Sequence, residues 1–360
     1  MTNAPVPRSR LRGLDGIRFL AAAAVVGYHY TGIATHYWGT APHNVFPTLN
    51  QITRYGYLGV ELFFMISGFV ILMTAYARPI ERFTASRVAR LFPAYWAAVV
   101  ITVVLQIFWD GGRNLSAPDI LLNLTMTQEA FDVTNVQGAF WTLWPELKFY
   151  LLIGVFILVG ITRRRIIALA VLWPLIAQLA KATDSGMLMS LLMPAYAPYF
   201  ALGMLLFLIY RDGNDAVVWL AAGYAWVFCL WRATEAAEHK SDLAEVYTSP
   251  VVVGLIVTAA AVSIWLVSSG PLRSLDWRPL TILGALTYPL YLVHGQFGFA
   301  VIDTLHERLP AYVVLALAIG VSLLIAVALH YLVERRWHDR LRDAVARGLR
   351  PAPTTDASRA

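Results

Sequence analysis

The sequence predicts an all-α membrane protein, a bundle of about ten transmembrane helices with both termini in the cytoplasm. Hydrophobic residues make up 58% of the 360-residue chain and charged residues only 14%. A soluble domain has about 45–50% apolar and about 25% charged residues. The apolar residues form continuous runs, without the period-two alternation of a membrane β-barrel. With a mean hydropathy of +0.60, the chain is not a soluble enzyme, a disordered protein or a nucleic-acid-binding module.

Ten segments are long and apolar enough to be transmembrane helices, which need about 20 such residues. The fifth and the seventh are the shortest. The segments are 14–33, 56–76, 88–109, 140–160, 166–182, 188–210, 216–232, 249–268, 280–301 and 311–333. The basic start and alanine-rich run of the first segment also fit a signal peptide. We interpret it as a retained helix, because Asp15, Arg18 and His29 interrupt the run.

The Lys and Arg residues indicate the orientation, because cytoplasmic loops carry an excess of them. With a cytoplasmic N-terminus, 20 of the 28 lie on the inner side and 6 on the outer side. This bias also explains the net charge of +6 without a nucleic-acid partner. We therefore expect a cytoplasmic segment (1–13), a membrane domain (14–337) and a basic, disordered cytoplasmic tail (338–360), in a multi-pass protein of the cytoplasmic (inner) membrane.

Ionisable residues inside the predicted spans are candidates for function, because their burial in a bilayer is costly. Arg18 lies about 6 Å from the inner edge of the first span, and His29 lies about 16 Å deeper on the same helix face. Glu61, Glu146 and His294 belong to other spans and, like His29, fall in the outer half of a hydrocarbon core about 30 Å thick. The single cysteine provides neither a disulfide nor a cysteine metal site, and we predict no metal.

A second group of charged residues lies near the cytoplasmic side. Arg87 and Arg90 stand at the inner edge of the third predicted span, and their spacing places them on one helix face. With Arg18 they form a basic layer that suits a phosphorylated cytoplasmic donor, because guanidinium groups bind phosphate in a bidentate manner. The outer imidazoles and carboxylates suit proton abstraction from a hydroxyl.

Five motifs occur in order between about residues 11 and 295. They are LDGIRFLAAAAVVGYHY with Arg18 and His29 in an Arg-x10-His arrangement, GYLGVELFFMISGFVI with Glu61, SRVARLFPAYW with Arg87 and Arg90, FWTLWPELKFYLL with Glu146 and Tyr150, and LGALTYPLYLVHG with His294. Together they resemble acyltransferase family 3, the integral membrane O-acyltransferases, in the core form that has no soluble esterase-like domain.

This resemblance implies transfer of an acyl group, most commonly acetyl, from cytoplasmic acyl-CoA to a hydroxyl. The acceptor would be a cell-surface glycan, a lipid-linked sugar or a secondary metabolite. Acyl-CoA is then a substrate, no cofactor is permanently bound, and the bilayer is the other partner. The site residues that follow are catalytic His29 and Glu146, donor-binding Arg18, Arg87 and Arg90, and a supporting polar layer of Glu61, Tyr150 and His294. His29 would act as a base on the acceptor hydroxyl, or as an acid to the leaving thiolate.

Each residue also has a structural interpretation. His29, Glu61 and His294 can serve helix packing, Arg18 can extend to the membrane interface, and the other two arginines are expected in a cytoplasmic loop. Glu146 and Lys148 are two residues apart and point to different faces, which disfavours their pairing. The Ser67–Gly68 pair is more typical of close helix packing than of a nucleophile.

Two other classes of membrane protein share this composition. A transporter or a flippase for a lipid-linked substrate is the main alternative, but the paired broken spans typical of transporters are not evident in the sequence. A membrane glycosyltransferase would need acidic residues in an early outer loop to hold a metal-bound donor. The loop 34–55 contains neither Asp nor Glu.

Overall fold

The computed structural model describes residues 11–113 and 115–349, and every regular element among them is helical. The long helices are α1 (Arg12–Thr31), α5 (Gly59–Ala75), α6 (Ile80–Phe108), α8 (Leu143–Val159), α9 (Arg163–Ala182), α11 (Ala197–Asp212), α12 (Ala216–Ala244), α13 (Pro250–Ser268), α14 (Arg278–Leu305) and α15 (Ala311–Leu329). The shorter elements are α2 (Thr35–Trp38), α3 (Pro42–Val45), α4 (Pro47–Thr53), α7 (Ala117–Asn123), α10 (Gly186–Leu192), α16 (Arg335–Gly348), the 3-10 turns η1 (Gly56–Leu58), η2 (Gln128–Phe131), η3 (Gly138–Thr142) and η4 (Pro271–Ser274), and the π-helical η5 (His330–Glu334).

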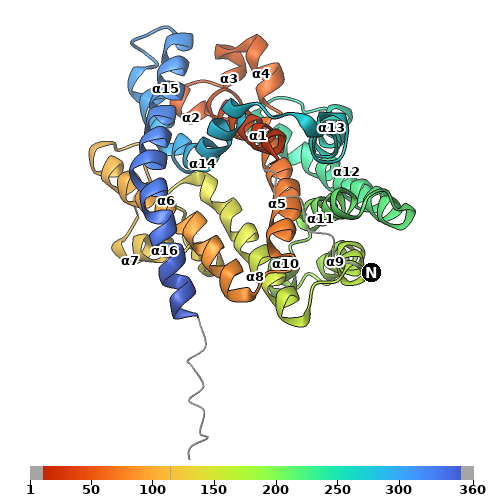
Figure 1. Ribbon diagram of the computed structural model, residues 1–360. Helices are drawn as coiled ribbons and strands as arrows, with labels where there is room; N and C mark the ends of the chain where they lie inside the picture. Colours follow the sequence, from red (N-terminus) through yellow and green to blue (C-terminus); the bar gives the residue numbers. More distant parts are fainter. Residues whose placement is uncertain (1–10, 114, 350–360) are drawn as a thin grey trace, which may run out of the picture.

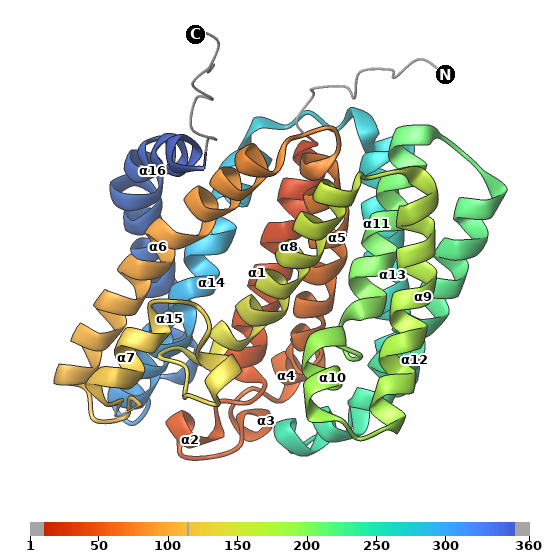
Figure 2. The same cartoon turned by 90° about the horizontal axis from the view of Figure 1, so that it is seen from below.

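The all-α fold class is thereby confirmed, and each of the ten predicted segments overlaps one of the long helices. The helices form one bundle in which α1, α5, α6, α8 and α14 surround the centre (Figure 1). In the described part of the chain, eight helices are long and apolar enough to cross a membrane, and α1 and α14 are not among them. The start of α1 and helix α16 lie at one end of the bundle, and α2, α3 and α4 lie at the opposite end (Figure 2).

Several helix boundaries differ from the prediction. Helix α6 begins at Ile80, directly after Pro79, rather than at 88. Arg87 and Arg90 therefore lie about 10 Å or more inside this helix and not at its edge. Helix α12 continues to Ala244 instead of ending at 232. Hydropathy detects only the apolar part of a helix, while the backbone stays helical until a residue breaks it.

The C-terminal tail also differs from the prediction. The expectation of disorder from residue 338 is wrong for its first part, because α16 continues the helix to Gly348. Apolar and charged side chains lie on different faces of α16, so this helix is strongly amphipathic. The basic composition of the segment alone does not reveal this pattern. Residues 350–360, the rest of the predicted tail, lie outside the described residues.

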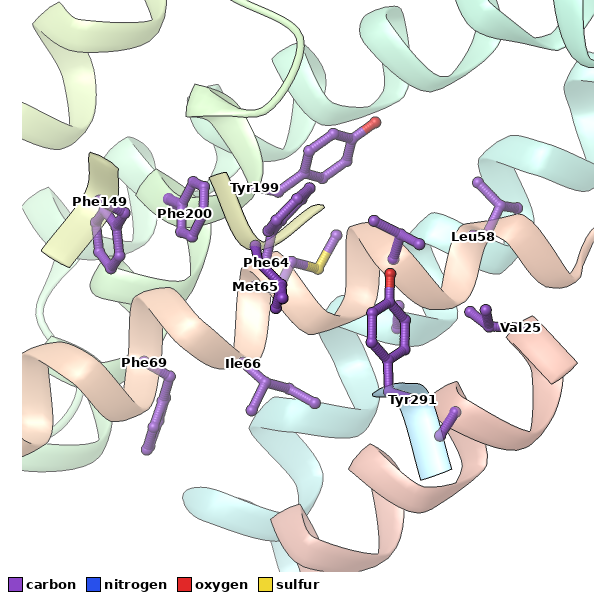
Figure 3. Packing of buried hydrophobic residues seen from close by; sticks show 14 of the residues in the cluster. Val25, Leu58, Phe64, Met65, Ile66, Phe69, Phe149, Tyr199, Phe200 and Tyr291 are labelled. Carbon is purple, nitrogen blue, oxygen red and sulfur yellow. The ribbon is translucent and has the colours of Figure 1, made fainter. Parts of the chain in front are cut away.

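The core of the bundle is built on the contact between α5 and α11. A Cβ atom at Gly68 would overlap the backbone of Phe200, and one at Gly203 would overlap the carbonyl oxygen of Met65. Small residues thus let the two helix backbones touch, as is common in membranes. Phe149 of α8 extends this contact by stacking on Phe200, with ring centroids 4.3 Å apart (Figure 3). The packing interpretation of the Ser-Gly pair is confirmed for Gly68.

Candidate active site

Two histidines from opposite ends of the sequence meet inside the bundle. His29 lies near the end of α1, and His294 lies in the middle of α14. Nε2 of His294 is 3.2 Å from Nδ1 of His29, and the ring centroids are 4.9 Å apart. His294 is completely buried, whereas His29 is partly accessible. The two imidazoles predicted for the outer layer therefore form a direct pair.

The hydrogen bonds of this pair determine which nitrogens carry protons. Nδ1 of His294 is 2.9 Å from the carbonyl oxygen of Tyr291, which can only accept, so Nδ1 donates and Nε2 is the basic nitrogen. Nδ1 of His29 is 2.9 Å from the carbonyl oxygen of Val25, so this nitrogen carries a proton too. The same N–H group is shared with the accepting Nε2 of His294. The lone pair of His29 is therefore on Nε2, to which none of the described residues hydrogen bonds.

A cavity of about 220 Å³ lies between α1, α5, α6, α8 and α14. It brings together residues of all five predicted motifs. The charged residues that line it are Arg18, Arg87, Arg90 and Glu146, and the hydroxyl-bearing ones are Ser67, Thr142, Tyr150, Thr287, Tyr288 and Tyr291. Of the eight predicted site residues, the structure places Arg18, Arg87, Arg90, Glu146 and Tyr150 around this one cavity.

The three arginines of the cavity have different surroundings. Arg90 forms an ion pair with Glu334 of η5. Arg18 has a weaker partner, since its Nη1 is 4.0 Å from a carboxylate oxygen of Asp15. Arg87 donates to Ser86 at 3.1 Å, but its buried Nε has no hydrogen-bond partner among the described residues. Within the described residues, Arg87 thus keeps a buried, unpaired donor beside the cavity.

Glu146 follows Pro145 in the first turn of α8 and is held by two hydroxyl groups. Ser67 donates to its Oε1 at 3.2 Å, and Tyr150 donates to the same oxygen. Lys148 does not pair with it, because the Lys148 ammonium donates to the carbonyl oxygen of Ser190 at 2.6 Å instead. The prediction that these two side chains point apart is confirmed.

Helix α14 connects the cavity with the histidine pair. Tyr288, Tyr291 and His294 follow one another at intervals of three residues and therefore share one helix face. Tyr288 lies under Arg90, with the guanidinium 5.6 Å from its ring centroid. Tyr291 lines the cavity, and its ring centroid is 5.6 Å from that of His294. The polar face of α14 therefore extends from the arginines to the histidine pair.

Glu61 lies apart from this face. It does not line the cavity, and no hydrogen bond joins it to His29 within the described residues. Sequence reasoning missed Glu334, Tyr288 and Tyr291. The two tyrosines were visible as a three-residue period before His294, whereas the partner of Arg90 lies 244 residues away and gives no local signal.

Long apolar helices around a buried, charged cavity define an integral membrane protein with its site inside the bundle. No three His, Cys, Asp or Glu residues in the described ranges are grouped to hold a metal. Residues 11–331 match acyltransferase family 3, described as an acyltransferase domain. The chain belongs to this family, and it is a multi-pass integral membrane protein.

Three relatives illustrate the range of the family. The chain is 27% identical to the putative membrane-bound transacylase BcsY of Komagataeibacter xylinus, over 91% of this chain and 83% of that protein. It is 31% identical to acyltransferase MdmB of Streptomyces mycarofaciens, over 39% and 38%. It is 27% identical to the peptidoglycan O-acetyltransferase OatA of Listeria monocytogenes, over 42% and 25%. The chain thus spans well under half of the last two relatives. No solved structure matches it.

Proposed function

We propose that this protein transfers an acyl group, most commonly acetyl, from cytoplasmic acyl-CoA to a hydroxyl of a cell-surface glycan, a lipid-linked sugar or a secondary metabolite. The polar face of α14, which extends from the arginine-lined cavity to the histidine pair, carries this proposal. Arginines that can bind an anion lie near one end of this face, and an imidazole with a free lone pair lies near the other. The names of the relatives, one a peptidoglycan O-acetyltransferase, support an O-linked product.

The cavity fits the linear arm of the donor. Arg18 and His29 are eleven residues apart on α1, or about 16 Å of helix. A thioester that reaches the histidines would leave the phosphates of CoA near Arg18 and Arg87, where guanidinium groups bind them. A volume of about 220 Å³ suits the pantetheine arm, and the nucleotide would remain at the cytoplasmic entrance.

His29 acts as the general base in this mechanism. Its Nε2 takes the proton of the acceptor hydroxyl while the oxygen attacks the thioester carbonyl carbon. The carbon–oxygen bond forms, the carbon–sulfur bond breaks, and His29 returns the proton to the sulfur of CoA. The products are an ester and a free thiol. His294 keeps the proton of His29 on Nδ1, so that Nε2 faces the substrate with its lone pair.

Glu146 has a positioning role in this proposal. Its Oε1 already accepts from Ser67 and Tyr150, and its charge interacts with that of Arg18. Glu146 thus fixes the wall of the cavity on which the donor arm lies. Direct transfer needs no acyl-enzyme, and Ser67 is engaged as a donor to a carboxylate.

The test uses membranes with matched amounts of wild-type protein, His29→Ala or the control His36→Ala, whose histidine is exposed in α2. After addition of radiolabelled acetyl-CoA, label is followed into the glycan, lipid and small-molecule fractions. We expect label in one fraction with wild type and the control, and a decrease of about 10²- to 10⁴-fold with His29→Ala. Equal labelling with His29→Ala would exclude His29 as the base. No labelling with any acyl-CoA would favour the transporter alternative.

A further inference from the structure

Among the buried polar atoms that have no hydrogen-bond partner in the described part of the chain, three lie close together outside the cavity. They are the hydroxyl oxygens of Tyr28 and Tyr57 and Oε2 of Glu61. The tyrosine residues are only 5% and 4% exposed. Buried polar groups are nearly always paired, so each such exception requires an explanation. Three unpaired polar atoms close together indicate that this place has a role other than helix packing.

These three groups form one cluster. The rings of Tyr28 and Tyr57 meet edge to face, with centroids 5.6 Å apart. The Glu61 carboxylate interacts electrostatically with both hydroxyl groups. The ammonium of Lys240 lies 5.3 Å from the ring centroid of Tyr57 and interacts with the charge of Glu61. The Glu61 carboxylate therefore has a cationic neighbour in Lys240.

The cluster adjoins the histidine pair. Tyr28 precedes His29 on α1, and their ring centroids are 5.6 Å apart. His29 also meets the ring of Phe299 of α14 edge to face, with centroids 6.3 Å apart. The partly accessible His29 is thus close to aromatic rings and to a set of polar atoms that are unpaired within the described residues.

We propose that Tyr28, Tyr57 and Glu61 form the acceptor subsite, and that it binds a neutral, hydroxyl-rich acceptor of the pyranoside type. The inference rests on the function proposed above. A carboxylate only accepts hydrogen bonds, whereas a tyrosine hydroxyl both donates and accepts. A sugar supplies several hydroxyls that match both kinds of group, and its carbon-bound hydrogens suit the aromatic rings. A hydroxyl of the same sugar then reaches Nε2 of His29.

The experiment compares acceptors with purified protein and radiolabelled acetyl-CoA. The probes are octyl β-glucoside, octyl β-galactoside and octyl β-N-acetylglucosaminide, each against 1-octanol, which has the same chain and a single hydroxyl. The variants are Tyr28→Phe, Tyr57→Phe and Glu61→Gln. The control is Tyr224→Phe, in which the lost hydroxyl bonds to the carbonyl oxygen of Val171 away from the cluster.

We expect wild type and the control to acetylate at least one glycoside in preference to octanol. Each Tyr→Phe variant should raise the KM for that glycoside about threefold to tenfold, the effect of one lost hydrogen bond, with an unchanged KM for acetyl-CoA. Glu61→Gln should raise it further, because the lost bond involved a charged group.

The inference would be overturned if octanol were as good an acceptor as every glycoside, or if the three variants behaved like the control. Failure of the proposed function gives a different result. In that case His29→Ala would not lower the transfer of label to any acceptor, including those of the native membrane. A second outcome against the inference is acetylation of the membrane acceptor at the same KM by wild type, Tyr28→Phe and Tyr57→Phe.

Discussion

At the scale of single residues, the histidine pair shows how a neutral partner can fix the orientation and the tautomer of a general base. A carboxylate beside His29 would stabilise its protonated form, whereas the neutral His294 only orients the ring and fixes its tautomer. His294 is itself fixed by carbonyl oxygens of its own helix. The basic nitrogen of His29 therefore depends on a residue that need not touch the substrate.

Substitution of His294 should thus affect turnover more than donor binding. With His294→Ala, we expect kcat to decrease by about tenfold to a hundredfold, less than the loss caused by removing the base itself. His294→Gln should recover part of this loss, because its amide oxygen can accept from Nδ1 of His29. The measurement is kcat and the KM for acetyl-CoA in membranes. A higher donor KM at unchanged kcat would contradict the positioning role.

Arg87 should contribute to recognition of the donor phosphates, because its Nε is buried and unpaired within the described structure. For Arg87→Ala we expect the KM for acetyl-CoA to rise about tenfold or more, the effect of lost charge-assisted hydrogen bonds. The KM for acetyl-pantetheine, which lacks the nucleotide phosphates, should change much less. Arg78→Ala, an exposed arginine at the same end, is the control. Equal losses with both donors would argue against phosphate binding.

The site could be predicted from sequence only in part. His29, Arg18 and Glu146 stood out because charge inside an apolar run is visible without a structure. The sequence predicted a spatial relation only for Arg18 and His29, whose eleven-residue interval places them on one face of the same helix. The pairing of His29 with His294 joins residues 265 positions apart, and no pattern within either segment specifies it.

At the scale of elements, η5 connects α15 with α16 through a π-helical turn. Such turns are frequent at functional sites. Here the turn carries Glu334, which is 3% exposed, to Arg90 of α6. His330 contacts the other carboxylate oxygen at 2.8 Å. The Arg90–Glu334 ion pair therefore links the start of α16 to α6, the helix that contributes two arginines to the cavity.

Glu334→Gln should loosen this connection. The loss of one partner from a buried ion pair leaves the other unpaired, and we expect a destabilisation of about 1–3 kcal/mol, the cost of an unsatisfied buried polar group. The measurements are the thermal midpoint in detergent and the rate of trypsin cleavage within α16, which is rich in arginine. Glu307→Gln is the control, since the side chain of Glu307 is 85% exposed. Unchanged cleavage would show that the pair does not hold α16.

The contact between α5 and α11 requires glycine at position 203, because the two helix backbones touch there. Gly203→Ala places a methyl group against the backbone of Met65, which cannot move without separating the helices. We expect a loss of about 1–3 kcal/mol or more. Gly223→Ala in α12 meets no atom within 4 Å and should be neutral or stabilising. Thermal unfolding of the two variants checks this difference. Similar midpoints would contradict the backbone contact.

The positions of helices were predicted well where apolar composition determines them. They were predicted poorly where a single residue interrupts the helix. The sixth predicted span, 188–210, is divided between α10 and α11. Met193 between them has a left-handed backbone, with a φ of 52°, and Pro194 follows it. The hydropathy of the segment is unaffected by this break, so an apolar run alone did not reveal it.

At the scale of the whole molecule, the two helices that carry the histidines are those that do not meet the composition criteria for a span. Helix α1 contains Asp15, Arg18 and His29, and α14 contains two prolines, two tyrosines and His294. Their polar residues point into the bundle and not to lipid, as is usual for ionisable residues in membranes. The ten segments predicted from the sequence include both, whereas the stricter count of eight omits the two helices on which the proposed mechanism depends.

The number of crossings and the orientation are tested by cysteine labelling in intact cells. In a Cys229→Ala background, single cysteines replace His36, Leu272, Glu307 or Asp343, all exposed in the structure. If both termini are cytoplasmic and α1 and α14 cross the membrane, a membrane-impermeant maleimide should label positions 36 and 307. Positions 272 and 343 should react only after the cells are opened.

Positions 272 and 307 flank α14, so labelling of both in intact cells would show that α14 does not span. Labelling of position 343 in intact cells would reverse the orientation and place the arginine cavity toward the outside. Cytoplasmic acyl-CoA could then not reach Arg18 and Arg87 directly. The topology is therefore a condition for the proposed mechanism, because the same arginines that bias the orientation are those that would bind the donor.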